Sequence, residues 1–313
     1  MPLFVGSGTT SGGGFEAQSS QAGIPTSTSD PQNANVGDVY VQRVGTGATM
    51  KLYDGSSWNQ VGGAQNIVPN ISGGDPYATA DGIYEIRAFE SPGTLTVSTR
   101  CVDAEAIIIG GGGGGGRGGG GAGGGIATSF TLAPGSYPIV VGYGGTASST
   151  SAVPNTVKGC PGGDTTFNGF TAIGGGGGGA SNPADPACPG GSGGGGVLWP
   201  GTPCLGGCGV CGQGNPGGNV DGGGGGYKTA GQPGPGAPGP AGARAGSSGS
   251  FKWGLPPSHP GTDSYGLTQF SGGGGGSPRI PGGGSFGTGG PTAGDPISNG
   301  CCGAVFIRFK KCQ

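Results

Sequence analysis

The chain has 313 residues, of which 87 are glycine and 27 are proline, and only 9% carry a charge. The 13 basic residues do not exceed the 15 acidic ones, which excludes binding of nucleic acid through a basic surface. No apolar run of about 18 residues is present, so no transmembrane helix is predicted, and residues 1–15 lack the pattern of a secretory signal peptide.

The N-terminal part of the sequence predicts three short regions. Residues 1–35 are rich in Gly, Ser, Thr and Gln, which is typical of a flexible attachment segment. Residues 36–63 alternate apolar and polar side chains around the turn Asp54-Gly55, which predicts a small β-hairpin or meander. Residues 64–81 contain two prolines and a Gly-Gly pair and are interpreted as a linker.

From residue 82 onward the pattern changes to strands that run directly into glycine runs. No stretch has the periodicity of a helix. We expect residues 82–313 to form one domain. The predicted strands are 83–89, 93–97, 104–109, 129–132, 137–141, 165–173 and 304–309, and the glycine runs are 110–125 with Arg117 and Ala122 inserted, 174–179, 193–196, 222–226, 272–276 and 282–284.

Glycine runs of this kind favour a particular packing. Without a Cβ, two backbones can approach closely, and an extended helix with three residues per turn directs its N–H and C=O groups outward to neighbours. The alternative is a set of flexible linkers, but strands feed straight into the runs. The sequence therefore predicts an all-β fold, a β-sandwich combined with a polyglycine-II helix bundle, with little or no α-helix. Residues 231–246 either join this bundle or form a loop of similar conformation, and Arg117 is expected to be a solvent-facing break in it.

The order of these motifs resembles a known family. Residues 91–97 and 102–109 are followed by GGGGGGGRGGGGAGGG, by APGSYPIVVGYGG at 133–145, by GGDTTFNGFTAIGGGGGG at 162–179 and by GAVFIRF at 303–309. This set is similar to the glycine-rich C-terminal domain of tailed-phage tail fibres and related virion proteins, and its runs resemble those of polyglycine adhesins. Residues 36–61 are similar to short repeats of phage fibre shafts.

The resemblance implies a location and partners. The chain would be a virion tail-fibre protein, assembled in the host cytoplasm and then extracellular, with a distal receptor-binding domain. Its N-terminus would bind other tail or fibre proteins, and its loops a host-surface glycan or outer-membrane protein. A homotrimer is implied by the resemblance to fibres. Two alternatives are a structural decoration or cement protein of the capsid or tail, and a cellular glycine-rich surface or ice-binding protein.

The long connections between glycine runs carry the candidate binding residues. Aromatic side chains stack on sugar rings and dominate contact energies, although small cores under long loops also use them. Trp253 and Tyr265, near the single histidine, are the favoured contacts. The full candidate set is Trp199, Tyr227, Phe251, Trp253, His259 and Tyr265, with Phe270 as a further aromatic of these loops.

The cysteines are candidates for disulfides or metal ligands, and the sequence contains no evident catalytic set. Loop-stapling disulfides are expected, because a virion is exposed to an oxidising exterior; the candidates are Cys160, Cys188, Cys204, Cys208, Cys211, Cys301, Cys302 and Cys312. The alternatives are an iron–sulfur site at Cys204, Cys208 and Cys211, or zinc bound by these with Cys188 or His259. No Ser-His-Asp set and no paired carboxylates are evident. We therefore expect no enzyme, no catalytic residue, no metal, no cofactor and no insertion into membranes.

Overall fold

The structure is a computed structural model that describes residues 26–44, 47–64, 70–78, 83–98, 101–148, 157–180, 186–199, 202–234, 245–251, 253, 255, 268–274, 286–290 and 299–310. Every regular element within these ranges is a β-strand, which confirms the predicted all-β fold. The same ranges contain no helix long and apolar enough to cross a membrane. The chain divides into two compact units, Met1–Val68 and Pro69–Gln313.

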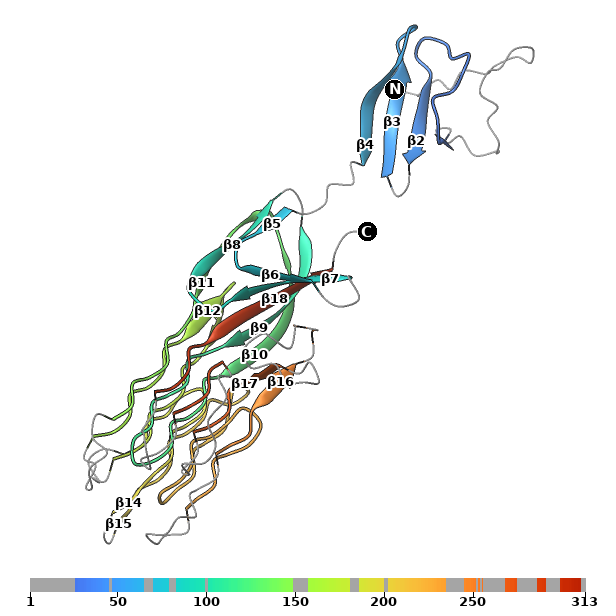
Figure 1. Cartoon of the computed structure of the whole chain (residues 1–313). Coiled ribbons are helices and arrows are strands. Elements are labelled where there is room, and N and C mark those ends of the chain that lie inside the picture. Colours follow the sequence, from blue (N-terminus) through green and yellow to red (C-terminus); the bar gives the residue numbers. More distant parts are fainter. Residues whose placement is uncertain are drawn as a thin grey trace. The chain divides into compact units, whose positions relative to one another are not determined.

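The first unit contains a four-stranded sheet, seen in Figure 1 as β2 to β4. Its strands, in spatial order, are β1 (Thr26–Ser27), β2 (Val39–Val44), β3 (Gly47–Tyr53) and β4 (Trp58–Ala64). The predicted turn joins β3 to β4: the Asp54 carboxylate accepts hydrogen bonds of 2.8 Å from the amides of Ser56 and Ser57, and Gly55 has a φ of 103°. The predicted meander is therefore present.

Part of the predicted flexible N-terminal segment is ordered on this sheet. Asp30 accepts a hydrogen bond from the hydroxyl of the buried Tyr40 and forms an ion pair of 2.6 Å with Lys51. The Pro31 carbonyl accepts a hydrogen bond of 3.1 Å from the Trp58 indole, whose ring lies 4.7 Å from that of Tyr40. The prediction of flexibility is therefore wrong for residues 26–35, because these contacts fix a polar segment whose composition alone suggested disorder. Residues 1–25 lie outside the described ranges.

The Asp30 contact predicts an acid transition in the first unit. Hydrogen bonds from Lys51 and Tyr40 lower the pKa of Asp30 below its usual 3.8. Because the folded pKa is below the unfolded one, this contact stabilises the fold above pH 3.8 and is lost as the pH falls through the folded value. We expect the NMR signal of the Trp58 indole N–H to shift in that acid range. In Asp30→Asn the acid-form signal is expected already at pH 7, and a parent-like signal would contradict the prediction.

The second unit contains a sandwich of two five-stranded sheets, whose strand pairs are all antiparallel. One sheet has the order β10 (Gly125–Leu132), β9 (Val102–Ile109), β18 (Ala304–Lys310), β7 (Tyr84–Phe89) and β6 (Asp75–Ala78). The other has the order β13 (Phe170–Ala172), β12 (Thr165–Phe167), β11 (Gly135–Val140), β8 (Gly93–Ser98) and β5 (Asn70–Ser72).

The predicted linker contributes two of these strands. β5 pairs with β8 and β6 pairs with β7, so the sandwich begins near residue 70 and not at residue 82. Pro76 is compatible with β6 because this strand is at a sheet edge, where a missing N–H is tolerated. Gly73 and Gly74, with φ of 95° and 64°, form the turn between the two strands. The interpretation of 64–81 as a linker is therefore wrong for residues 70–78.

Two apolar clusters lie on opposite faces of the β9–β18–β7 sheet. Because side chains alternate along a strand, Ile108 of β9 faces the space between the sheets, whereas Ile107 and Ile109 face outward. Between the sheets, the buried side chains include Leu95, Val97, Phe167, Val305, Ile307 and Phe309. The outer face is covered by Phe251, Leu255, Phe270 and Phe286, which pack around Phe306.

Beyond the sandwich, the chain continues as extended segments that lie side by side (Figure 1). Every amide of residues 118–124 donates to a backbone carbonyl, and the acceptor segment repeats at every third residue. Residues 118, 121 and 124 donate to 173–179, residues 119 and 122 to 222–225, and residues 120 and 123 to 287–290. The carbonyls of 118–124 accept from 110–116, 192–195 and 274.

This pattern is that of a polyglycine-II bundle. A helix with three residues per turn directs successive amides toward three different neighbours, and three further segments donate to the carbonyls. The hydrogen bonds of 118–124 to these segments are 2.7–3.1 Å long. The bundle therefore pairs its buried backbone groups between segments, as buried groups require, and the sequence prediction of such a bundle is confirmed.

Close approach explains why glycine dominates these segments. At most of their glycines an added Cβ would lie closer than 3.0 Å to a neighbouring backbone atom, which real Cβ atoms essentially never show. Two buried serines are accommodated beside glycines: Ser192 lies against Gly214, and Ser271 against Gly287. These two side chains thus lie where a neighbouring glycine leaves room.

A matched pair of substitutions tests this packing. In Gly123→Ala the new methyl group would collide with the backbone of residue 110, whereas in Gly272→Ala the nearest atom, Cβ of Ser248, is 3.6 Å away. We expect Gly123→Ala to destabilise the protein by about 1–3 kcal/mol or more and Gly272→Ala to change the free energy of unfolding by less than about 1 kcal/mol. Thermal denaturation monitored by circular dichroism measures both. Equal effects of the two substitutions would contradict the packing argument.

Candidate functional site

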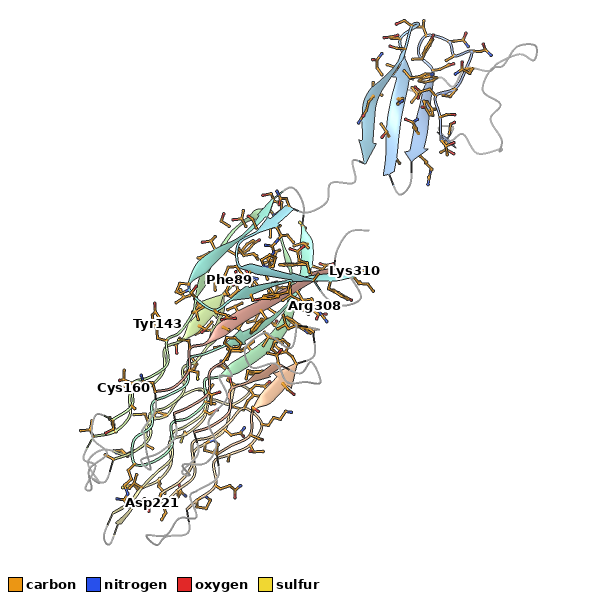
Figure 2. All side chains as sticks on the ribbon, in the orientation of Figure 1. Phe89, Tyr143, Cys160, Asp221, Arg308 and Lys310 are labelled. Carbon is orange, nitrogen blue, oxygen red and sulfur yellow. The ribbon has the colours of Figure 1, made fainter. Side chains whose placement is uncertain are left out.

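The end of the bundle farthest from the sandwich, here called the distal end, carries connections between segments. A hairpin of β14 (Leu198–Trp199) and β15 (Thr202–Pro203) lies there, as Figure 1 shows. The turn at Arg117 joins 110–116 to 118–124, and Asp221 lies at the same end in Figure 2. The distal end thus presents turns and a hairpin on a scaffold held by backbone hydrogen bonds.

An ion pair joins two of the distal turns. The Arg117 Nε lies 3.3 Å from Oδ1 of Asp221, with side-chain exposures of 32% and 30%. The expected solvent-facing position of Arg117 is therefore corrected to a half-buried one. Val220 and Asp221 both have positive φ, 53° and 48°, a conformation that is costly for a β-branched residue. Since exposed pairs contribute at most about 1 kcal/mol, the pair positions the turn more than it stabilises the fold.

The long connection between the glycine runs 193–196 and 222–226 is mostly part of the bundle. The amides of Cys204, Gly207 and Val210 donate to residues 197, 194 and 190–191, which repeats the three-residue period of the glycine runs. Residues 217 and 220 donate in turn to 207 and 204. This connection is therefore not a single loop. It contains two further bundle segments, whose Cys, Leu, Asn and Val residues obscure the glycine pattern in the sequence.

Three of the predicted contact aromatics lie beside the sandwich and not at the distal end. Phe251 is only 8% exposed and belongs to the outer apolar cluster, with its ring 5.2 Å from that of Phe306. Tyr227 and Trp253 are half-buried and pack against the same cluster, which also contains the buried Phe270. These three aromatics therefore follow the alternative of a small core under the loops, because they cover the apolar outer face of the sheet.

Trp253 also contacts a charged residue of the sheet. The Arg308 guanidinium lies over the rings of Trp253 and Tyr84, 4.9 Å and 4.7 Å from their centroids, and forms an ion pair with Glu105 of β9. Figure 2 shows Arg308 beside Lys310, and both residues belong to β18. These contacts attach the segment containing Trp253 to the sheet, so this tryptophan has a structural role.

The other predicted contacts are described in part or not at all. The backbone of Trp199 is in the distal hairpin, and its side chain is not described. His259 and Tyr265 lie outside the described residues. The structure adds Tyr143, which is 71% exposed, and Leu205, which is 67% exposed. Sequence reasoning missed Tyr143 because it follows a strand pattern, and Leu205 because it lies in a long connection between glycine runs. The three-residue spacing of the glycines near each of them is the signal that identifies both as residues of bundle segments.

The cysteines are spread along the second unit. The structure holds Cys101, Cys160, Cys188, Cys204, Cys208, Cys211, Cys301 and Cys302 as free thiols, and Cys312 lies outside the described residues. Disulfides between loops thus stay a prediction. Burial, aided by the neighbouring Cys302, raises the pKa of the Cys301 thiol and lowers its reactivity.

The metal alternatives find no support in the described part of the chain, where no group of three or more His, Cys, Asp or Glu side chains is placed to hold an ion. Cys204 and Cys208 lie on one extended segment, in which each residue rises about 3.1 Å, so their α-carbons are about 12 Å apart. That separation also excludes a disulfide between these two residues.

A comparison with protein families agrees with the geometry. Residues 88–310 match the model of a family described as a glycine-rich domain, and the chain belongs to this family. No curated protein matches the chain.

The position of Phe251 predicts a stability effect. Phe251→Ala removes a ring from the cluster that covers the outer face of the sheet, and is expected to reduce the free energy of unfolding by about 3–5 kcal/mol. Tyr143→Ala, which removes an exposed ring, is expected to change it by less than about 0.5 kcal/mol. Chemical denaturation of the two variants measures the difference. A Phe251→Ala protein as stable as the parent would show that this ring is not part of a core.

Proposed function

We propose that this protein is a virion tail-fibre protein of a tailed phage and that the distal end of its bundle is a receptor-binding, adhesin surface. The observation that carries the proposal is a scaffold bonded internally through backbone groups, with a hairpin and turns at the end remote from the sandwich. The motif order that resembles phage fibre domains supports the same function. The protein belongs to the virion in this proposal.

The scaffold suits recognition for a physical reason. Binding is strengthened when the contacting groups are held in place before the partner arrives, because less freedom is lost on association. Every amide of a segment such as 118–124 is bonded within the bundle. The connections between the segments are therefore the parts whose side chains can vary in chemistry. The partner proposed is a host-surface glycan or an outer-membrane protein, bound without catalysis, with Trp199 of the distal hairpin as an aromatic contact.

The first unit has a separate role in this proposal. It is a compact sheet of its own, distinct from the glycine-rich unit. We assign to it the attachment to other tail or fibre proteins, with the chain assembled as a homotrimer. The near balance of 13 basic and 15 acidic residues argues against a nucleic-acid partner for either unit.

A decoration or cement protein of the virion is the second candidate. It is favoured by Tyr143 and Leu205, which expose large apolar side chains on the bundle. Contiguous exposed apolar patches mark surfaces that pack against another protein, and this candidate requires Tyr143 or Leu205 to be part of such a patch. In such a protein the sides of the bundle, and not its distal end, would contact the particle.

Competition for adsorption distinguishes the two functions. Purified full-length protein is added in excess to host cells before the phage that carries this chain, and free phage is counted with time. An adhesin slows adsorption, and Trp199→Ala is expected to need roughly 30-fold more protein for the same effect, as loss of an aromatic contact worth about 2 kcal/mol implies.

Tyr143→Ala is the matched control, because it removes an exposed aromatic ring from a bundle segment. It is expected to compete as the parent does. If the parent protein leaves adsorption unchanged while antibody-gold labelling finds it on the capsid or tail, the adhesin function is excluded and the decoration function is supported.

A further inference from the structure

In the outer segments of the bundle, two of the three residue positions per turn face neighbouring segments and the third is exposed. In 157–163, Gly159 and Gly162 donate to the segment 174–179, and Cys160 and Gly163 donate to the segment 143–146. The third position in each turn holds Lys158 and Pro161, both exposed. Because the helix has three residues per turn, this position recurs on one side and faces away from the bundle. We call it the outward position.

The segment 186–191 repeats this arrangement. Cys188 and Gly191 donate to the carbonyls of residues 177 and 174, and Gly190 donates to that of Cys208. The outward positions hold Pro186 and Pro189, which are exposed and have no N–H to donate.

Within the described outer segments, no outward position is a glycine, although glycine is the commonest residue of the chain. The positions between them are mostly glycine or other small residues. Figure 2 shows side chains along the outside of the bundle. The outward residues, all exposed, are Tyr143 and Thr146, Lys158 and Pro161, Pro186 and Pro189, Leu205 and Cys208, Pro216 and Asn219, and Asn299 and Cys302.

The packing inside the bundle explains what a glycine at these positions would do. Neighbouring segments approach so closely that a Cβ at the contact would overlap backbone atoms. A side chain at an outward position therefore prevents another polyglycine segment from packing there. A row of glycines would instead expose backbone N–H groups to such a segment, much as an exposed edge strand does in a β-sheet.

We propose that the outward side chains close the sides of the bundle against the polyglycine segments of a second copy of this chain. The surface they cover fits a partner of one kind, a side-chain-free extended segment that would continue the hydrogen-bonding pattern by one more row. This inference rests on the bundle geometry and does not depend on the proposed function.

The test removes the outward side chains of the segment 186–191 in the full-length protein, with Pro186→Gly and Pro189→Gly. Sedimentation velocity in the presence of a thiol reductant, which excludes disulfide-linked species, measures association across a range of concentrations. We expect the weight-average mass of the variant to rise with concentration to roughly twice that of the parent or more, since association follows mass action.

Two control variants test whether association comes from the lost side chains, from the added N–H groups or from the loss of a proline as such. Pro186→Ala with Pro189→Ala introduces the same two N–H groups as the glycine variant but keeps a Cβ at each position. It is expected to sediment like the parent. Pro92→Gly makes the same change at an exposed proline outside the bundle, in the turn before β8, and is also expected to sediment like the parent.

A second row, opened by Tyr143→Gly with Thr146→Gly, repeats the test without prolines. Hydrogen exchange of residues 118–124 reports whether each variant retains the bundle. The proposal is overturned if both glycine variants keep protected amides and the mass of the parent, or if the alanine variant associates as strongly as the glycine variant. Loss of protection in both glycine variants also overturns it, because the outward residues would then be required for the bundle itself.

Discussion

The hydrogen bond between backbone groups of neighbouring side-chain-free segments is the interaction on which the second unit depends. In most domains an apolar interior excludes water and the backbone is paired within strands or helices. Here the interior of the bundle is backbone, and each central segment such as 118–124 is bonded on all sides. A single hydrogen bond contributes only about 0.5–1.5 kcal/mol net, so the order of the bundle comes from their number. Close approach is the condition for all of them, which is why most residues of its interior are glycine.

The sandwich supplies what glycine segments lack, which is a defined register. Segments without side chains have no pattern to fix how they slide past one another, whereas the alternation of a strand fixes its pairing. The pairing of β9 with β10 ends at Ile109 and Gly125, and the next hydrogen bond, from Gly110 to Gly124, continues it into the bundle. Strands β13 and β18 also adjoin glycine segments. The apolar cores therefore set the alignment of a region that contains almost no apolar side chains.

The sequence predicted the parts of the fold that depend on local pattern. Alternation in 104–109 and 304–309, the turn at Asp54-Gly55 and the bundle itself all follow from short stretches read alone. It missed β5 and β6, whose Pro and Gly residues suggest a linker and whose pairing partners lie farther along the chain. It also placed Phe251 and Trp253 in exposed loops, because nothing local shows that the chain returns to the sandwich between glycine segments. For the distal end the sequence identified a role for the connections between segments, but not which of them are bundle segments.

The position of the last strand has a consequence for synthesis. β18 lies in the middle of its sheet, between β9 and β7, although it is far from both in the sequence. During translation, β7 and β9 leave the ribosome long before the strand that joins them, so the larger sheet stays open until β18 has been synthesised. Pairings over such long separations form slowly. The larger sheet is thus completed only after residues 304–310 have left the ribosome, and a ribosome that stops short of residue 304 yields a product without the centre of this sheet.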